Sequence, residues 1–138
     1  MDSLFLDTSF IVALEDEDDQ NHHTASLVWH KFKKHPKKLT TSTFIFDETV
    51  TVLRRRVSFK KASEVGKKLL KSSLAEIVHV SADDFESAWT LFLKYDDKKL
   101  SFTDCVSFAI MRKLSIRNAL TFDKHFQQMG FGSICLEL

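Results

Sequence analysis

The sequence predicts an α/β fold in which parallel strands are joined by helical crossovers. Short apolar runs alternate along the chain with longer stretches in which apolar residues recur every three or four positions. Those stretches span about a dozen residues or more, which is what a crossover between parallel strands requires. With 138 residues, of which 43% are hydrophobic and 13 are Phe, the chain can bury one core and is too short for two. We therefore expect a single domain over residues 1–138.

Five stretches are candidates for strands, because each is a short apolar or β-branched run that ends in polar residues. In order, they are residues 3–7, 39–42, 76–80, 119–122 and 133–136. The first run ends in Asp7 and is followed by Thr8 and Ser9, residue types that begin helices. A strand followed at once by a helix is therefore expected at the start of the chain.

Helices are expected between the strands, in the stretches with helical apolar spacing. One of them stops before Pro36, and another opens at Ser81 with a capping box that includes Asp84. The apolar positions of this second helix are Phe85, Ala88, Trp89, Phe92 and Leu93. The full set is a helix after residue 7, one through 25–32, one over 44–57, one over 60–72, the one from 81 onward, one over 102–114 and one over 124–129.

Hydropathy and cysteine usage indicate the compartment. The longest unbroken apolar run, residues 10–14, is five residues long, far short of the roughly 20 that span a bilayer. No basic segment precedes a long apolar one, so no secretory signal is expected. Cys105 and Cys135 lie in apolar stretches without CxxC spacing, which is typical of buried thiols in a reducing compartment. We expect a cytoplasmic protein with no membrane-spanning segment.

The charge balance restricts the ways in which the chain could hold a polyanion. Twenty basic residues against 19 acidic ones leave a formal charge of +1. A nucleic acid would therefore have to be held by local patches or by a metal ion, not by the field of the whole protein. The 3 Gly are not clustered after a strand, and this excludes the glycine-rich loops that cradle nucleotide phosphates.

Four acidic residues from distant segments are placed to meet at one edge of the sheet. Asp7 ends the first predicted strand and Asp123 follows the fourth, and the carboxyl ends of parallel strands share one edge. Asp104 lies in the first turn of a predicted helix. Glu48 lies on a mostly apolar face of the helix after the second strand, whereas the adjacent Asp47 has more polar neighbours. We favour Glu48 as the residue that enters the site, and the sequence leaves the alternative open.

Such a cluster would be costly without a counter-ion. Two like charges about 4 Å apart repel by roughly 4 kcal/mol at an effective dielectric of about 20. Either some of the acids hold protons or a cation neutralises them. Oxygen ligands without a cysteine or a paired histidine favour Mg²⁺ or Mn²⁺ over Zn²⁺, and such ions support reactions at phosphate. Each acid alone could be a helix cap, a turn residue or a solvated side chain, so only the joint arrangement is informative.

The segments that carry these acids resemble the PIN-domain nucleases, and among them the small single-domain members that include VapC-type toxins of toxin–antitoxin pairs. The resemblance covers essentially the whole chain. It rests on Leu4-Phe-Leu-Asp7-Thr-Ser-Phe-Ile-Val-Ala-Leu14, Asp47-Glu48 after a Thr/Ser-rich strand, Ser101-Phe-Thr-Asp104, and Leu120-Thr-Phe-Asp123-Lys-His-Phe126.

The resemblance implies one PIN-like nuclease domain over residues 1–138, with a parallel sheet of about five strands and helices on both faces. It implies that the acidic quartet Asp7, Glu48, Asp104 and Asp123 holds Mg²⁺ or Mn²⁺ and forms the catalytic site for RNA cleavage. Ser9 and Thr121 match hydroxyl positions that support the acids. It also implies a homodimer and, for a toxin, inhibition by an antitoxin protein.

The most polarised stretch of the chain is basic. Residues 54–71 contain eight Lys or Arg and one acid, Glu64. Arg54, Arg55 and Arg56 could bind RNA phosphates or a protein partner, and a solvated helical face is the third possibility. We favour the protein partner, because the outer turns of this helix pair are expected to lie some way from the acidic edge.

Three functions fit the sequence to different degrees. The first is a metal-dependent endoribonuclease that cleaves phosphodiester bonds of single-stranded RNA. The second is an aspartate-based phosphatase with Asp7 as nucleophile, but such enzymes place a second acid two residues later and this chain has Ser9. The third is a catalytically silent RNA-binding or adaptor domain, which would have no need of all four acids.

Overall fold

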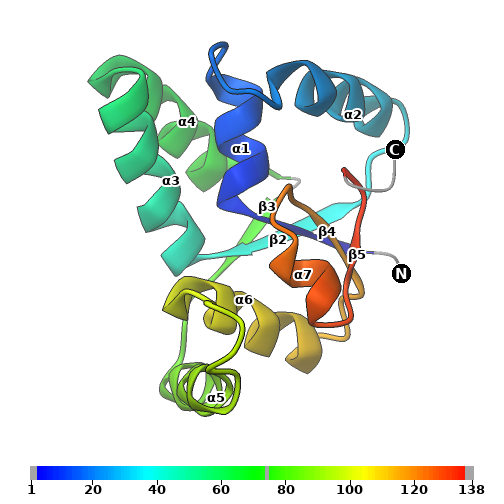
Figure 1. Cartoon of the computed structure of the whole chain (residues 1–138). Coiled ribbons are helices and arrows are strands. Elements are labelled where there is room, and N and C mark those ends of the chain that lie inside the picture. The colour runs from blue at the N-terminus through cyan, green and yellow to red at the C-terminus, as the bar shows by residue number, and fades with distance from the viewer. Residues whose placement is uncertain (1–2, 74, 136–138) are drawn as a thin grey trace.

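Strand β1 lies at the centre of a five-stranded sheet in which all neighbours pair in parallel, in the order β3-β2-β1-β4-β5 (Figure 1). The computed structural model describes residues 3–73 and 75–135. The elements are β1 (Ser3–Leu6), α1 (Thr8–Glu15), α2 (His22–Lys34), β2 (Lys38–Ser42), α3 (Thr43–Arg56), α4 (Phe59–Lys71), β3 (Ala75–Val78), α5 (Ala82–Lys94), α6 (Phe102–Lys113), β4 (Asn118–Leu120), α7 (His125–Gln128) and β5 (Gly132–Ser133).

Helices cover both faces of the sheet, as expected for parallel strands joined by crossovers (Figure 1). Side chains of β1 alternate between the two faces. On one face, the ring of Phe5 lies 6.4 Å from that of Phe126 in α7, which in turn contacts Phe108 of α6. On the other, Leu6 lines a groove beside α1 and α4. The α/β fold and the five-stranded parallel sheet are thus confirmed.

The chain changes direction across the sheet at β1, and this places the site. Strands β1, β2 and β3 follow one another toward one edge, and the chain then returns to add β4 on the other side of β1. Ligands of open parallel sheets bind outside the carboxyl ends of the strands at such a switch point. Here the switch point lies between Asp7, which follows β1, and the loop after β4. The backbone N–H of Asp7 donates to Leu120 O at 3.2 Å.

Predicted and observed elements differ mainly at their ends, where side-chain caps decide the boundary. Asp7 is not the last residue of β1 but the N-cap of α1. Ser42 caps α3, so this helix starts one residue earlier than expected. The fifth strand is confined to Gly132–Ser133, and residue 136 of the predicted strand lies outside the described residues.

Helix α5 begins with the predicted capping box of Ser81 and Asp84, and Asp84 also pairs with Lys113 of α6 at 3.2 Å. Asp84 is structural, as expected. Among the apolar positions that predicted this helix, only Ala88 is buried. Helical spacing alone identifies an apolar stripe but not what covers it, and here most of the stripe faces outward.

The two cysteines are buried, as their apolar sequence surroundings predict. Cys105 and Cys135 are buried and free, and burial raises the pKa of each thiol to about 11. In the ranges 3–73 and 75–135, no helix is long and apolar enough to span a membrane.

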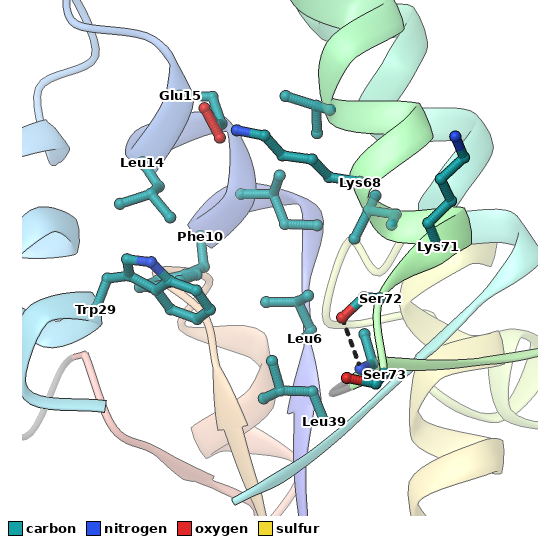
Figure 2. A pocket seen from close by; sticks show the side chains of 14 residues that line it. Leu6, Phe10, Leu14, Glu15, Trp29, Leu39, Lys68, Lys71, Ser72 and Ser73 are labelled. Atoms are coloured by element: carbon teal, nitrogen blue, oxygen red, sulfur yellow. Dashed lines mark hydrogen bonds between the residues drawn. The ribbon is translucent and has the colours of Figure 1, made fainter. Parts of the chain in front are cut away.

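An apolar groove of about 500 Å³ lies on the α1, α2 and α4 side of the sheet. Figure 2 shows Phe10 and Trp29 projecting into it from α1 and α2, with Leu39 on the strand side. Lys68 and Lys71 of α4 stand along its rim (Figure 2). The groove is distinct from the acidic cavity.

Candidate active site

Five acidic side chains line one cavity of about 420 Å³ at the carboxyl edge of the sheet: the four acids that the sequence predicted and Asp19. Asp7 follows β1 as the N-cap of α1, Glu48 comes from α3, Asp104 from the first turn of α6 and Asp123 from the loop after β4. The structure therefore brings together the four acids that the sequence singled out, each from a different element.

Asp7 is buried and serves both as a helix cap and as a wall of the cavity. Its Oδ2 accepts hydrogen bonds from Ser9 Oγ and Thr121 Oγ1, each at 2.7 Å. Burial raises the pKa of Asp7 to about 6, with the two hydroxyl donors opposing the rise and the charges of Asp123 and Glu48 adding to it. The two hydroxyl residues thus lie where supporting residues were expected.

The same hydroxyls tie the loop after β4 to β1. Ser9 Oγ accepts from the backbone N–H of Phe122 at 2.9 Å, and Thr121 Oγ1 accepts from that of Asp123 at 3.0 Å. The two oxygens are themselves 3.1 Å apart. This network fixes Asp123 relative to Asp7, because the Thr121 hydroxyl donates to the Asp7 carboxylate and accepts from the backbone N–H of Asp123.

Asp104 closes a capping box with Ser101, whose backbone N–H it accepts at 3.2 Å. Burial and the negative charges of Asp123 and Asp7 raise the pKa of Asp104 to about 7, against the lowering effect of the Ser101 hydrogen bonds. Asp104 can be a helix cap and line the cavity at the same time, because the capping box uses one of its two carboxylate oxygens, Oδ2.

Glu48, and not Asp47, lies among the described residues that line the cavity. Glu48 is half-buried and Asp47 is exposed. The predicted orientation of this helix face is therefore what the structure has. Val52 and Arg56, four and eight residues later, line the same cavity, because residues four apart share a helix face.

Sequence reasoning missed His125. Its Nδ1 lies 2.8 Å from Asp123 Oδ1 and 3.8 Å from Asp104 Oδ2. Nδ1 is buried and makes no hydrogen bond with the described residues, although Asp123 Oδ1 lies this close to it. Asp104, Asp123 and His125 each offer a ligand atom, and these atoms lie within 4.8 Å of one another. The sequence feature that could have identified His125 is the run Asp123-Lys-His125, which directly follows the predicted strand at residues 119–122.

The three arginines at the end of α3 have different surroundings. Arg56 lines the acidic cavity, and its Nη1 lies 3.5 Å from Asp19 Oδ2. Arg54 lies over the ring of Phe59 at 5.1 Å, and Arg55 is exposed. The expectation that this segment lies away from the acidic edge is wrong for Arg56, because the cavity extends along the face of α3 that Glu48 occupies.

A divalent cation fits this donor set. Two of the acids have pKa values raised in part by the charges of their neighbours, and a cation would relieve that repulsion. Carboxylate oxygens are the ligands that Mg²⁺ and Mn²⁺ prefer. The buried and unbonded Nδ1 of His125 adds a further donor beside two of them.

Metal-free protein should become less stable as pH rises through the acid range. The pKa of Asp104 is about 7 in the folded protein against an ordinary value of 3.8. Its contribution to stability is therefore fully present below about pH 4 and is lost as pH rises toward 7. Asp104→Asn should therefore stabilise the metal-free protein at pH 8 by on the order of 2 kcal/mol, and not at pH 4. Thermal melts in chelator measure this, and a lower melting temperature for the variant at pH 8 would show that the cap outweighs the repulsion.

The sequence-family model of the PIN domain matches residues 4–132 of the chain. The 23S rRNA-specific endonuclease VapC20 of Mycobacterium tuberculosis is 38% identical over 128 residues, which are 93% of this chain and 95% of the relative. A crystal structure of M. tuberculosis VapC20, described as a sarcin-ricin loop cleaving toxin, matches with a TM-score of 0.87 at 37% identity, over 95% of this chain and 98% of that one. FitAcB from Neisseria gonorrhoeae matches with a TM-score of 0.66 over 98% of this chain and 99% of its own, and at 16% identity this likeness shows the fold alone.

Proposed function

The chain belongs to the PIN-domain family, and from this premise we propose that it is a metal-dependent endoribonuclease that cleaves phosphodiester bonds of single-stranded RNA. The observation that carries the proposal is the meeting of Asp7, Glu48, Asp104 and Asp123, from four distant segments, in one cavity. A fold alone would not require that convergence.

The acidic quartet would hold Mg²⁺ or Mn²⁺, with His125 completing the donor set. When bound, such an ion neutralises charge that develops on the phosphate and makes water a better nucleophile. Ser9 and Thr121 orient Asp7 by donating to its Oδ2, and its other carboxylate oxygen would be available to hold a cation. Ser101 holds Asp104 through the capping box, in which its backbone N–H donates to Asp104 Oδ2.

The proposed substrate class is a loop of ribosomal RNA, and the proposed compartment is the cytoplasm. The support is the similarity over nearly the whole chain to an endonuclease specific for 23S rRNA and described as cleaving the sarcin-ricin loop. We further propose that the chain acts as a toxin and that an antitoxin protein and a second copy of the chain are its protein partners.

Cleavage of an oligoribonucleotide that contains the sarcin-ricin loop tests the function. Purified protein should cut it in Mg²⁺ or Mn²⁺ and stop in excess EDTA. A shuffled oligoribonucleotide of equal length is the control for substrate preference. Cleavage that persists in chelator would contradict the metal mechanism, and no cleavage of either RNA with either ion would contradict the nuclease.

We propose that the RNA backbone follows two cations on the cavity wall, Arg56 and Lys99. Arg56→Gln should weaken RNA binding by a similar factor for different sequences and reduce the salt dependence by about 0.7 in slope, the value for one single-strand phosphate contact. Arg55→Gln is the matched control, since Arg55 is adjacent and exposed like Arg56 but is not among the described residues that line the cavity. Salt titrations of both variants measure this, and an unchanged slope for Arg56→Gln would exclude the contact.

An antitoxin would bind the basic residues that lie outside the acidic cavity. Lys68 and Lys71 flank the apolar groove of Figure 2, which suits an apolar segment with acidic residues at its sides. Arg54 and Arg55 would also serve this partner. The protein encoded beside this chain should co-purify with it and stop cleavage, and Lys68→Glu with Lys71→Glu should weaken both effects.

A further inference from the structure

Lys99 has a backbone conformation that residues with a side chain disfavour. It is the last residue of the turn over residues 96–99, which lies between α5 and α6 (Figure 1), and its φ is +40°. In this left-handed region the Cβ of an L-residue crowds the backbone, and glycine adopts the conformation freely. Among the described residues other than glycine, only Ser115 also has a positive φ, at +57°. The turn therefore has a lysine where a glycine would be less strained.

Contacts on both sides of Lys99 hold this conformation. Before it, the backbone N–H of Lys98 donates to Tyr95 O at 3.4 Å. After it, Leu100 is buried and Ser101 is the N-cap of α6. A strained backbone conformation persists only where the surrounding structure determines it. The strain thus follows from the way in which the turn joins two helices, and nothing in these contacts requires a lysine side chain.

Lys99 is one of the residues that line the acidic cavity. It is exposed, and the ion pairs formed within the described part of the chain do not include it, whereas its neighbour Lys98 lies 3.5 Å from Asp97. The other Lys or Arg on the cavity wall is Arg56, which lies 3.5 Å from Asp19. Lys99 therefore brings to the cavity an ammonium group that has no carboxylate in direct contact.

The two cations of the cavity are anchored at different places. Lys99 precedes the capping box of Asp104 by two residues, and in that box Ser101 N–H donates to Asp104 Oδ2 at 3.2 Å while Ser101 Oγ accepts from Asp104 N–H at 3.0 Å. Arg56 ends α3, eight residues after Glu48 and so about 12 Å farther along the helix axis. Lys99 is therefore tied to the acids of the cavity more closely than Arg56 is.

Hydrolysis of a phosphodiester changes the charge on the oxygens around phosphorus. Water forms a new bond to phosphorus and gives up a proton, while the bond to the leaving sugar oxygen breaks and that oxygen takes up a proton. A cation that faces these oxygens in advance stabilises the transition state. A lysine ammonium is a compact charge with three donors on a flexible stem, and in this role it keeps its proton throughout.

We propose that Lys99 is a catalytic residue, whose ammonium group contacts the phosphate that is cleaved, while Arg56 contacts a neighbouring phosphate of the bound RNA. The inference rests on the proposed nuclease function and adds a residue to it. Strained backbone conformations cluster at sites where a side chain must be held for function, which suits a lysine in this turn. A contact that strengthens in the transition state affects kcat, whereas one that serves RNA binding alone affects KM.

Lys99→Gly separates a catalytic role from a structural one. Glycine relieves the strain at φ +40°, so the melting temperature should rise by about 2–4 °C, while kcat should fall on the order of tenfold to a hundredfold. Ser115→Gly is the matched control, because Ser115 is strained in the same way and exposed but is not among the described residues that line the cavity. It should raise the melting temperature similarly and leave kcat within about twofold of wild type.

Lys99→Met and Lys99→Arg test the charge. Lys99→Met removes the charge and keeps a flexible stem, so the single-turnover rate at saturating RNA should fall on the order of tenfold to a hundredfold. RNA affinity, measured in chelator so that the RNA stays intact, should change less than about threefold. Lys99→Arg should recover most of the rate. Arg56→Gln should show the opposite division, with a larger loss in affinity than in rate at saturation.

The outcomes distinguish this inference from the nuclease proposal. If wild-type protein cleaves RNA and Lys99→Met cleaves it within about twofold of that rate, the nuclease proposal holds and Lys99 is not catalytic. If Lys99→Met loses affinity but keeps its rate at saturation, Lys99 is a binding residue and the inference is wrong. If Lys99→Met only lowers the melting temperature in chelator, the lysine merely offsets the charge of the acids, which also overturns it. If wild-type protein cleaves no RNA, both proposals fail.

Discussion

Replacing Asp104 by Asn is expected to abolish RNA cleavage while the chain still folds, with a loss in rate on the order of a thousandfold or more. The amide keeps the shape of the carboxylate and can still accept the Ser101 N–H that closes the capping box. It removes a negative charge and a hard oxygen ligand from a cavity that four other acids line. Single-turnover cleavage in Mn²⁺ measures the effect.

The chain offers a matched control for this change. Asp84 closes a capping box of the same kind at the start of α5. It is not among the described residues that line the cavity. Asp84→Asn should therefore cost stability, because it weakens the contact with Lys113, and leave the cleavage rate within about twofold of wild type. Equal losses of cleavage in the two variants would show that Asp104 acts only as a cap.

The adjacent acids of α3 should behave in opposite ways. Glu48→Gln is expected to reduce cleavage on the order of a hundredfold or more, whereas Asp47→Asn should change it less than about threefold. Glu48 lines the cavity and its charge contributes to the raised pKa of Asp7, while Asp47 is exposed. Both substitutions remove one charge from the same helix turn, so each controls for the other.

Cleavage rates for this pair under identical Mn²⁺ concentrations decide the assignment. Loss of cleavage in Asp47→Asn with retention in Glu48→Gln would contradict the observed orientation of α3. A similar loss in both would indicate that the total charge near the cavity matters more than the position of one carboxylate.

The acids could be predicted from the sequence because each is anchored to a local signal. Asp7 and Asp123 follow strands, Asp104 lies in a capping box, and Glu48 lies on an apolar face of a helix. The carboxyl ends of parallel strands lie at one edge of the sheet, so residues at these positions are expected to meet there. For Asp7 the sequence allowed a helix cap or a site residue, and the structure shows a cap that also lines the cavity.

Other features depend on contacts between segments that the sequence does not indicate. The environment of His125 arises because α7 and the start of α6 meet beside Asp123. Arg56 lines the cavity because α3 extends along it for two turns beyond Glu48. The outward direction of the α5 stripe follows from the way α5 packs on α6 with Ala88 and Leu91 buried. Apolar periodicity gives no information on which face of the helix is covered.

Binding of Mn²⁺ to the chain, without RNA, tests the central claim most directly. Titration followed by the electron paramagnetic resonance of free Mn²⁺ should show ions bound by wild-type protein and by Asp84→Asn, and lost or strongly weakened binding in Asp104→Asn. Equal binding by all three proteins, or none by the wild type, would contradict the claim that the acids converging on this cavity hold a divalent cation.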